Sequence, residues 1–132
     1  MFNKQKQPPI KSLIADGSQI TGNYVFTDGL RVDGAVVGDV RSRDEDQPSI
    51  LVISETASVT GEIYADHIII NGRVRGPVHA NVMLELQPKA RIEGDVHYKA
   101  LEMHQGALIA GQLRPLLDGE EKPTLKLAAN NG

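Results

Sequence analysis

The chain has 132 residues and a formal net charge of −3, so it has room for one domain and no second core. The negative charge argues against a nucleic-acid binder, and the absence of cysteine excludes a disulfide framework and a zinc-thiolate site. Residues 1–13 lack the apolar centre of a signal peptide, and no apolar run approaches the roughly 20 residues that a membrane span requires. We therefore expect a cytoplasmic protein.

The amino-terminal segment, residues 1–12, is predicted to be a disordered tail, because Pro8 and Pro9 prevent a helix across it. Its three lysines precede the first acidic residue, Asp16. One interpretation is a solvated terminus, and the other is a peptide that contacts an anionic membrane surface. The residues predicted to make such a contact are Met1, Phe2, Lys4 and Lys6. Each lysine would contribute only about 1 kcal/mol, so stable binding would need the avidity of many copies in a polymer.

From residue 13 onward a five-residue pattern recurs, with a glycine at its centre and an apolar residue at each end. Six copies are centred on Gly22, Gly38, Gly61, Gly76, Gly94 and Gly111. The steps between these glycines are 16, 23, 15, 18 and 17 residues, and the long step contains the charged segment 41–48, which is predicted to be an inserted surface loop. A repeat near 17 residues is too short for ankyrin, tetratricopeptide or leucine-rich units, and it is typical of a β-solenoid coil with two or three short strands.

The residues two positions before and after each glycine are predicted to face the interior. Eleven of these twelve residues are Val, Ile or Leu, and the twelfth is Tyr24. Strand alternation also turns the glycine inward, which we attribute to a narrow place where opposite walls approach too closely for a side chain. The pattern predicts an all-β, single-domain parallel β-helix of about six coils over residues 13–117. Coils about 4.8 Å apart would make a rod about 29 Å long.

No amphipathic helix is evident that could cover either end of this predicted solenoid. A terminal coil exposes its strand edges and apolar interior, and the polar segment 118–132, predicted to be a disordered tail, is poorly suited to cover them. Unless the tails fold over the ends, two open ends predict end-to-end polymerisation. The residues predicted to form this interface are Ile14, Ile20, Tyr24 and Phe26 at one end and Leu108, Ile109, Leu113 and Leu116 at the other.

Polar side chains at equivalent repeat positions are predicted to form ladders on the outer surface. His79 and His97 each follow a repeat glycine by three residues, so we expect them to stack on adjacent coils. We interpret this column as a surface ladder and not as a metal or catalytic site, because His67 and His104 occupy other repeat positions. The same column holds Val25, Arg41, Tyr64 and Arg114.

A set of basic residues could form a patch on the rod, which is either a solvated face or a docking site for an acidic partner or nucleic acid. These residues are Arg73, Arg75, Lys89, Arg91 and Lys99. No Gly-x-x-x-x-Gly-Lys motif occurs, so we expect no nucleotide or other cofactor.

The repeats resemble those of the bactofilins, bacterial cytoskeletal proteins with one β-helical domain between short unstructured tails. The resemblance covers roughly residues 13–117 and is based on segments 30–34 and 70–72 and on the repeated glycine-acid-valine patterns. It implies a right-handed β-helix, nucleotide-independent polymerisation through the ends, and an amino terminus that touches the inner membrane, which favours the membrane interpretation of residues 1–12. It also implies clients in cell-wall remodelling, cell shape or division.

The main alternative is an enzyme, the left-handed hexapeptide β-helix of acyltransferases and related metalloenzymes. Its coil is also near 18 residues, but it requires glycine after many aliphatic residues, where this chain has Ile69, Arg75, Gln87 and Glu93. The irregular steps also disrupt a strict six-residue repeat. We therefore predict a non-enzymatic scaffold with no catalytic, cofactor or metal residues. Its expected partners are further copies of itself, the anionic inner face of the cytoplasmic membrane, and clients such as cell-wall enzymes.

Overall fold

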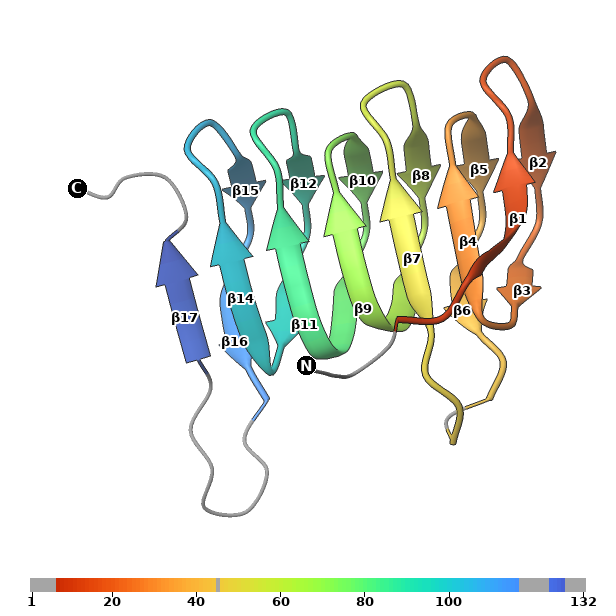
Figure 1. Cartoon of the computed structure of the whole chain (residues 1–132). Coiled ribbons are helices and arrows are strands. Elements are labelled where there is room, and N and C mark those ends of the chain that lie inside the picture. Colours follow the sequence, from red (N-terminus) through yellow and green to blue (C-terminus); the bar gives the residue numbers. More distant parts are fainter. Residues whose placement is uncertain (1–6, 45, 117–123, 128–132) are drawn as a thin grey trace.

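The computed structural model describes residues 7–44, 46–116 and 124–127. These residues form 17 β-strands and no helix, and every strand pair is parallel (Figure 1). The strands stack on three walls around one aliphatic core, and each coil of the chain contributes one strand to each wall. The predicted all-β parallel β-helix is confirmed.

Each strand belongs to one of three walls, except for two long strands that belong to two walls each. Wall 1 consists of β1 (Ile10–Ile14), β4 (Gly29–Val32), β7 (Ile50–Ile53), the second halves of β9 (Ile63–Ile70) and β11 (Val78–Leu86), β14 (Ala100–Met103) and β17 (Thr124–Leu127). Wall 2 consists of β2 (Gln19–Thr21), β5 (Ala35–Val37), β8 (Ser58–Thr60), β10 (Arg73–Arg75), β12 (Arg91–Glu93) and β15 (Leu108–Ala110). Wall 3 consists of β3 (Tyr24–Phe26), β6 (Val40–Ser42), the first halves of β9 and β11, β13 (Val96–Tyr98) and β16 (Leu113–Pro115). The long strands β9 and β11 each turn the corner from wall 3 to wall 1.

The coils follow one another along the axis with a defined hand. Wall 2 has six strands, so the described chain makes six complete coils, and β17 adds a seventh strand position on wall 1 alone. In Figure 1 the strands of wall 1 run upward at the front, the chain returns downward at the back, and each coil lies to the left of the one before. The solenoid is therefore right-handed.

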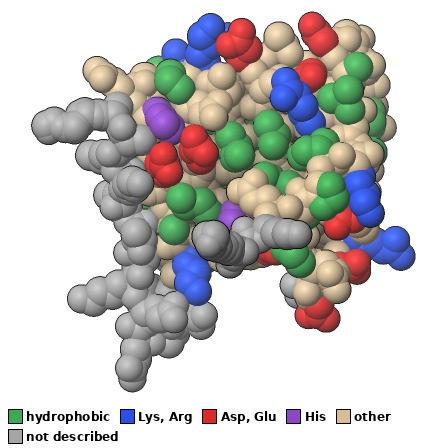
Figure 2. All heavy atoms as spheres, viewed as in Figure 1, with side chains coloured by type: hydrophobic (Ala, Val, Ile, Leu, Met, Phe, Trp, Pro, Cys, Tyr) green, Lys and Arg blue, Asp and Glu red, His purple; other side chains and the backbone are tan. Residues whose placement is uncertain are grey.

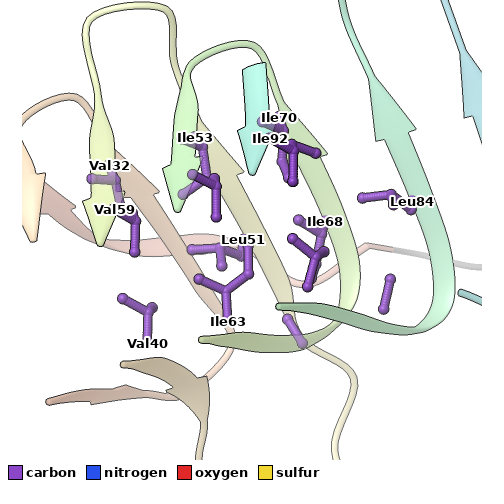
Figure 3. Close-up of a cluster of buried hydrophobic side chains, with 14 of the residues drawn as sticks. Val32, Val40, Leu51, Ile53, Val59, Ile63, Ile68, Ile70, Leu84 and Ile92 are labelled. Carbon is purple, nitrogen blue, oxygen red and sulfur yellow. The ribbon is translucent and has the colours of Figure 1, made fainter. Parts of the chain in front are cut away.

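The core is built of columns in which the same repeat position is buried in coil after coil (Figure 3). The wall 2 column holds Val36, Val59, Val74 and Ile92, and the wall 3 column holds Val40, Ile63, Val78 and Val96. All eight are at most 2% exposed. Parallel strands in register therefore convert a 17-residue sequence period into continuous aliphatic stacks, and the predicted inward positions are confirmed for the four central copies of the pattern.

The repeat glycines lie at the corner between wall 2 and wall 3, and not inside a strand. β10 ends before Gly76 and β11 begins after it, and Gly76 has a φ of 147°, in the region that favours glycine. A Cβ on Gly76 would collide with the carbonyl oxygen of Gly61 in the preceding coil. The equivalent collision recurs at Gly38, Gly61, Gly94 and Gly111. The prediction that opposite walls exclude the side chain is wrong, because the close approach is between successive coils along the axis.

The structure differs from the expected boundaries at the amino-terminal end. β1 begins at Ile10, inside the segment 1–12 that was expected to be an unstructured tail. Pro9 and Ile10 cross the outer face of wall 1 over Gly29, where a Cβ would lie 2.6 Å from the carbonyl oxygen of Pro9. Figure 1 shows this segment in front of the wall. Gly29 is thus the position that lets the incoming chain lie close to the sheet.

Two further expectations need adjusting. Segment 41–48, expected to be an inserted loop, begins with Arg41 and Ser42 in β6, so the loop starts at residue 43. Segment 118–132, expected to be a disordered tail, contains β17, which pairs with β14. The described part of the carboxyl-terminal segment therefore extends wall 1 by one strand.

Candidate functional site: the two ends of the solenoid

The amino-terminal end is formed by β1, β2 and β3, each of which pairs on one side only within the described residues, with β4, β5 and β6. Ile20 and Tyr24 occupy inner columns of this coil but are only partly buried. Their neighbours in the next coil, Val36 and Val40, are 1% and 0% exposed. Because the columns are otherwise equivalent, the difference reflects the absence of a coil beyond. Within the described residues, the inner columns of walls 2 and 3 are therefore only partly covered at this end.

The carboxyl-terminal end is open on two walls. Within the described residues, β15 and β16 pair only with β12 and β13. Leu113 continues the wall 3 column but is 44% exposed, whereas its neighbour Val96 is fully buried. Ile109 continues the wall 2 column and is partly buried. Wall 1 differs, because β17 lies along the edge of β14.

The structure separates the eight residues predicted to form the interface. Ile20, Tyr24, Ile109 and Leu113 lie in the inner columns of the terminal coils, two at each end. Ile14 and Phe26 are buried in the core, at 4% and 3% exposure. Leu108 is exposed, but on the outer face of wall 2 in register with Arg91, and Leu116 follows β16 and donates its backbone N–H to the carbonyl oxygen of Tyr98. The first four are therefore the best candidates for contacts across an end.

The predicted membrane-contact residues Met1, Phe2, Lys4 and Lys6 lie outside the described residues. Among the residues that the structure describes, no helix is long and apolar enough to span a membrane.

The outer face of wall 1 combines apolar and charged side chains. Figure 2 shows hydrophobic side chains near the centre of this face and charged side chains mainly toward its margins. Val52 and Ile69 lie side by side at outward positions of β7 and β9, and both are partly exposed. On the following two strands the same outward column holds Glu85 and Glu102. From β7 to β14 this outward column therefore changes from apolar to acidic.

The predicted histidine column is present on the outer face of wall 3. The rings of His79 and His97 stack with centroids 4.4 Å apart, and Tyr64 stacks on the other side of His79 at 4.0 Å. The guanidinium carbon of Arg41 lies 4.6 Å from the centroid of the Tyr64 ring. The strand register places Val25 and Arg114 at the two ends of this column. Four stacked planar groups therefore tie neighbouring coils together from outside.

Burial lowers the pKa of His79, the hydrogen bond to Glu62 opposes this effect, and the neighbouring His97 and Arg41 lower the pKa further. The net direction is downward, which favours neutral imidazole in the stack.

A second ladder, which the sequence analysis missed, runs beside the repeat glycines. The residue after three of the glycines, Gly22, Gly38 and Gly94, accepts a hydrogen bond from the backbone N–H one coil further on. These bonds join Asp39 to Asn23, Glu62 to Asp39 and Gln112 to Asp95, with N···Oδ1 distances of 2.9, 2.9 and 3.0 Å. The spacing of these polar residues matched the repeat, but their role depends on the corner geometry, which the sequence did not indicate.

The predicted basic patch is divided between different parts of the surface. Arg73, Arg75 and Arg91 share the outer face of wall 2. Arg75 pairs with Glu93 at 3.2 Å, and Arg91 donates to the backbone carbonyls of Pro88, Ala90 and Gly106. Lys89 lies at the corner between walls 1 and 2, where it pairs with Glu55, and Lys99 lies between β13 and β14. Wall 2 therefore carries the basic residues that lie together.

One cluster of metal-competent side chains was also missed. Nε2 of His104 lies 3.0 Å from Oε2 of Glu85 and 3.4 Å from Oε2 of Glu102, and the three side chains are 23–28% exposed. These described residues could together hold a divalent cation, although in the present arrangement the histidine bridges the two carboxylates. The signal available in the sequence was the spacing of 17 residues between the two glutamates, which equals one coil.

Three walls of parallel strands and continuous aliphatic columns define an all-β solenoid of stacked coils. The family model described as Bactofilin, polymer-forming cytoskeletal, matches residues 12–114. The chain belongs to the bactofilin family and is thus a polymer-forming cytoskeletal protein. Comparisons with curated proteins and with solved structures give no significant match. The family is a structural one, which favours the scaffold over the hexapeptide-enzyme alternative.

Proposed function

We propose that the protein assembles end to end, with the carboxyl-terminal coil of one copy stacked on the amino-terminal coil of the next, into a filament that needs no nucleotide. The observation that carries this proposal is the exposure of the inner columns at the ends, above all that of Leu113 against the fully buried Val96. A head-to-tail contact between two different surfaces repeats without closing, and therefore produces an open filament.

The columns define how two copies would meet. If the coil spacing continues across the junction, Leu113 lies over Tyr24 of the next copy and Ile109 lies over Ile20. The free edges of β15 and β16 would pair with β2 and β3, which removes unpaired strand edges from water. Full burial of a large aliphatic side chain contributes about 1.5–3 kcal/mol, so several partly exposed side chains and two strand edges favour association.

Sedimentation of purified variants tests the end-to-end contact. Leu113→Arg places a charge in the exposed inner column and is expected to shift the protein from the pellet to small soluble species. Val37→Arg is the matched control, since Val37 is similarly exposed, at 45%, but lies on the outer face of β5, outside the inner columns and not in a terminal coil. The proposal fails if the Leu113→Arg protein, shown by circular dichroism to be folded, pellets like the unchanged chain.

We further propose that the filament lies against the inner face of the cytoplasmic membrane through Met1, Phe2, Lys4 and Lys6. The path of Pro9 and Ile10 over wall 1 supports this, because in a continuous stack every copy would bring its amino terminus to the same side. Each contact would be weak, about 1 kcal/mol per lysine, and a row of copies would add them by avidity. The exposed walls would then be free for clients in cell-wall remodelling, cell shape or division.

Co-sedimentation with vesicles separates membrane binding from assembly. Deletion of residues 2–6 and the double variant Lys4→Glu, Lys6→Glu are each expected to abolish binding to anionic vesicles while filaments still form. Vesicles of neutral lipid are the control for the charge contribution. Unchanged binding of the deletion variant to anionic vesicles would refute the membrane proposal and leave the end-to-end contact standing.

A further inference from the structure

The cluster of Glu85, Glu102 and His104 lies on the outer face of wall 1, where two successive coils meet. Glu85 belongs to β11 and Glu102 to β14, and the parallel register places them side by side. His104 follows the end of β14 on the same outward side of the chain as Glu102, as strand alternation requires. The three side chains are only 23–28% exposed. Two coils therefore bring three possible metal ligands to one partly buried place.

The two carboxylates of this cluster form a like-charged pair on neighbouring strands. Like charges side by side destabilise a sheet, and elsewhere in the same solenoid an acidic residue meets a basic one, as Glu93 meets Arg75. Among the described side chains, neither Glu85 nor Glu102 is paired with a lysine or an arginine. The register places one basic residue, Lys126, next in the column after two acidic ones. This part of wall 1 therefore favours the binding of a cation.

The donor atoms of the cluster are spaced as metal ligands are. Nε2 of His104 lies 3.0 Å from Oε2 of Glu85 and 3.4 Å from Oε2 of Glu102, and the ligand atoms of the three residues all lie within 4.8 Å of one another. Zinc binds imidazole nitrogen and carboxylate oxygen at about 2.0–2.2 Å, so two ligands of a tetrahedral site lie about 3.3–3.6 Å apart. Gln87 supports the arrangement from the preceding coil, because its Nε2 donates to Oε2 of Glu85 at 3.5 Å. A metal ion fits between the three donors after small movements of the side chains.

We propose that Glu85, Glu102 and His104 bind one divalent transition-metal ion of the zinc type, which ties the last complete coil to the coil before it. One imidazole nitrogen and two carboxylate oxygens suit Zn²⁺, whereas Mg²⁺ and Ca²⁺ prefer ligand sets of oxygen alone. Three protein ligands leave a fourth position of the tetrahedron open to solvent, so the site is more open than a structural zinc site with four protein ligands. The inference is independent of how copies of the protein meet, since one chain supplies all three ligands.

Zinc binding is measured by isothermal titration calorimetry on the full chain, purified without an affinity tag and freed of metal with a chelator. One Zn²⁺ per chain is expected to bind, and Mg²⁺ to bind far more weakly. Glu102→Gln and His104→Gln are each expected to weaken zinc binding at least tenfold. His79→Gln is the matched control, because His79 contacts a single glutamate, Glu62, and is expected to leave the affinity unchanged.

Thermal unfolding gives a second readout, because an ion that binds the folded chain raises its unfolding temperature. Zn²⁺ is expected to raise this temperature for the unchanged protein and for His79→Gln, but not for Glu102→Gln or His104→Gln. Without metal, Glu102→Gln is expected to unfold no earlier than the unchanged protein, since it removes one of two like charges. The inference is overturned if the unchanged chain binds no Zn²⁺, if His104→Gln binds it equally well, or if Mg²⁺ binds as tightly as Zn²⁺.

Discussion

Oε2 of Glu62 lies 2.6 Å from Nε2 of His79, one coil further along wall 3. The contact depends on Pro77, which follows the next repeat glycine and has no backbone N–H to offer. At the preceding coil, the carboxylate of Asp39 accepts the N–H of Glu62, but Glu62 has no such donor opposite it and its carboxylate reaches His79 instead. Because of this proline, the contact between Glu62 and His79 joins the hydrogen-bond ladder beside the glycines to the stack of rings on wall 3.

Stability is expected to fall with acidification below about pH 6.5 through His79. Its pKa in the folded protein is lowered from the usual 6.5, with burial as the largest cause, so the unfolded chain binds the proton more tightly. The contribution is therefore fully present above the unfolded pKa and is lost as the pH falls through the folded one. Thermal unfolding between pH 8 and pH 5 should show a shallower decline for His79→Gln than for the unchanged protein. His67→Gln, on wall 1, is the control, and equal slopes for His79→Gln and the unchanged chain would contradict the prediction.

Gly76→Ala is expected to destabilise the fold strongly. The substituted residue would have to adopt a φ of 147°, and its Cβ would meet the carbonyl oxygen of Gly61, which belongs to the backbone of a central coil and cannot move independently. A left-handed conformation alone costs an L-residue about 1–2 kcal/mol, and the collision adds to this. Chemical denaturation should show a lower free energy of unfolding.

The control for that experiment is Gly22→Ala. Gly22 has the same repeat position and a φ of 129°, but a Cβ there has no atom within 4 Å, since no coil precedes it in the described part of the chain. It therefore carries the conformational cost without the collision. Equal losses in Gly76→Ala and Gly22→Ala would mean that the close approach of successive coils is not what requires glycine.

Much of the fold could be predicted from the sequence, because stacking in register repeats the same local requirement every 17 residues or so. The apolar residues around Gly38, Gly61, Gly76 and Gly94 all proved to be buried, and the outward column of His79 formed as its spacing indicated. What failed was the reason for the glycines. The period of a sequence pattern predicts whether a side chain points toward the core or toward solvent. It does not show how closely the backbone of the neighbouring coil approaches.

The ends were harder to predict than the middle, since a terminal coil has no second neighbour to define it. Phe26 and Ile14 are apolar and were predicted to be exposed at the amino-terminal end, but they are buried. β17 was missed because it follows the last glycine pattern and lies within a polar segment. Its pairing with β14 is a long-range contact that the spacing of the repeats does not predict. The cluster of Glu85, Glu102 and His104 likewise required the register of β11 and β14.

Gly22→Ala should also act on assembly more than on folding. In a continuous stack, the corner of Gly22 would meet Gly111 of the preceding copy in the way that Gly38 meets Gly22 within one chain. The new Cβ would then collide with the carbonyl oxygen of Gly111 across the junction. Pelleting is expected to decrease sharply, while Gly17→Ala, which also has a positive φ and open space but lies between β1 and β2, should pellet normally. Normal assembly of the Gly22→Ala protein would argue against stacking in this register.

Two of the isoleucines in the wall 2 column, Ile92 and Ile109, offer a comparison of folding with assembly. Ile92 is 2% exposed, with a coil on either side of it in the wall 2 column, and Ile109 is the next residue of that column in the terminal coil, where it is only partly buried. Ile92→Ala is expected to lower the free energy of unfolding by about 2–5 kcal/mol, as for other buried isoleucines. Ile109→Ala should cost less in the unassembled protein, because part of its surface is already exposed to solvent.

In the filament the truncation of Ile109 is expected to have the larger effect on assembly. Ile109 would be covered there by Ile20 of the next copy, so the truncation would leave a cavity at the junction. Ile109→Ala is therefore expected to raise the critical concentration for assembly clearly, in a protein whose unfolding is only mildly affected. Sedimentation at several protein concentrations and denaturation of the unassembled protein measure the two effects on the same sample. If Ile109→Ala destabilises the fold as much as Ile92→Ala and leaves the critical concentration unchanged, the carboxyl-terminal coil is not an open surface that a second copy completes.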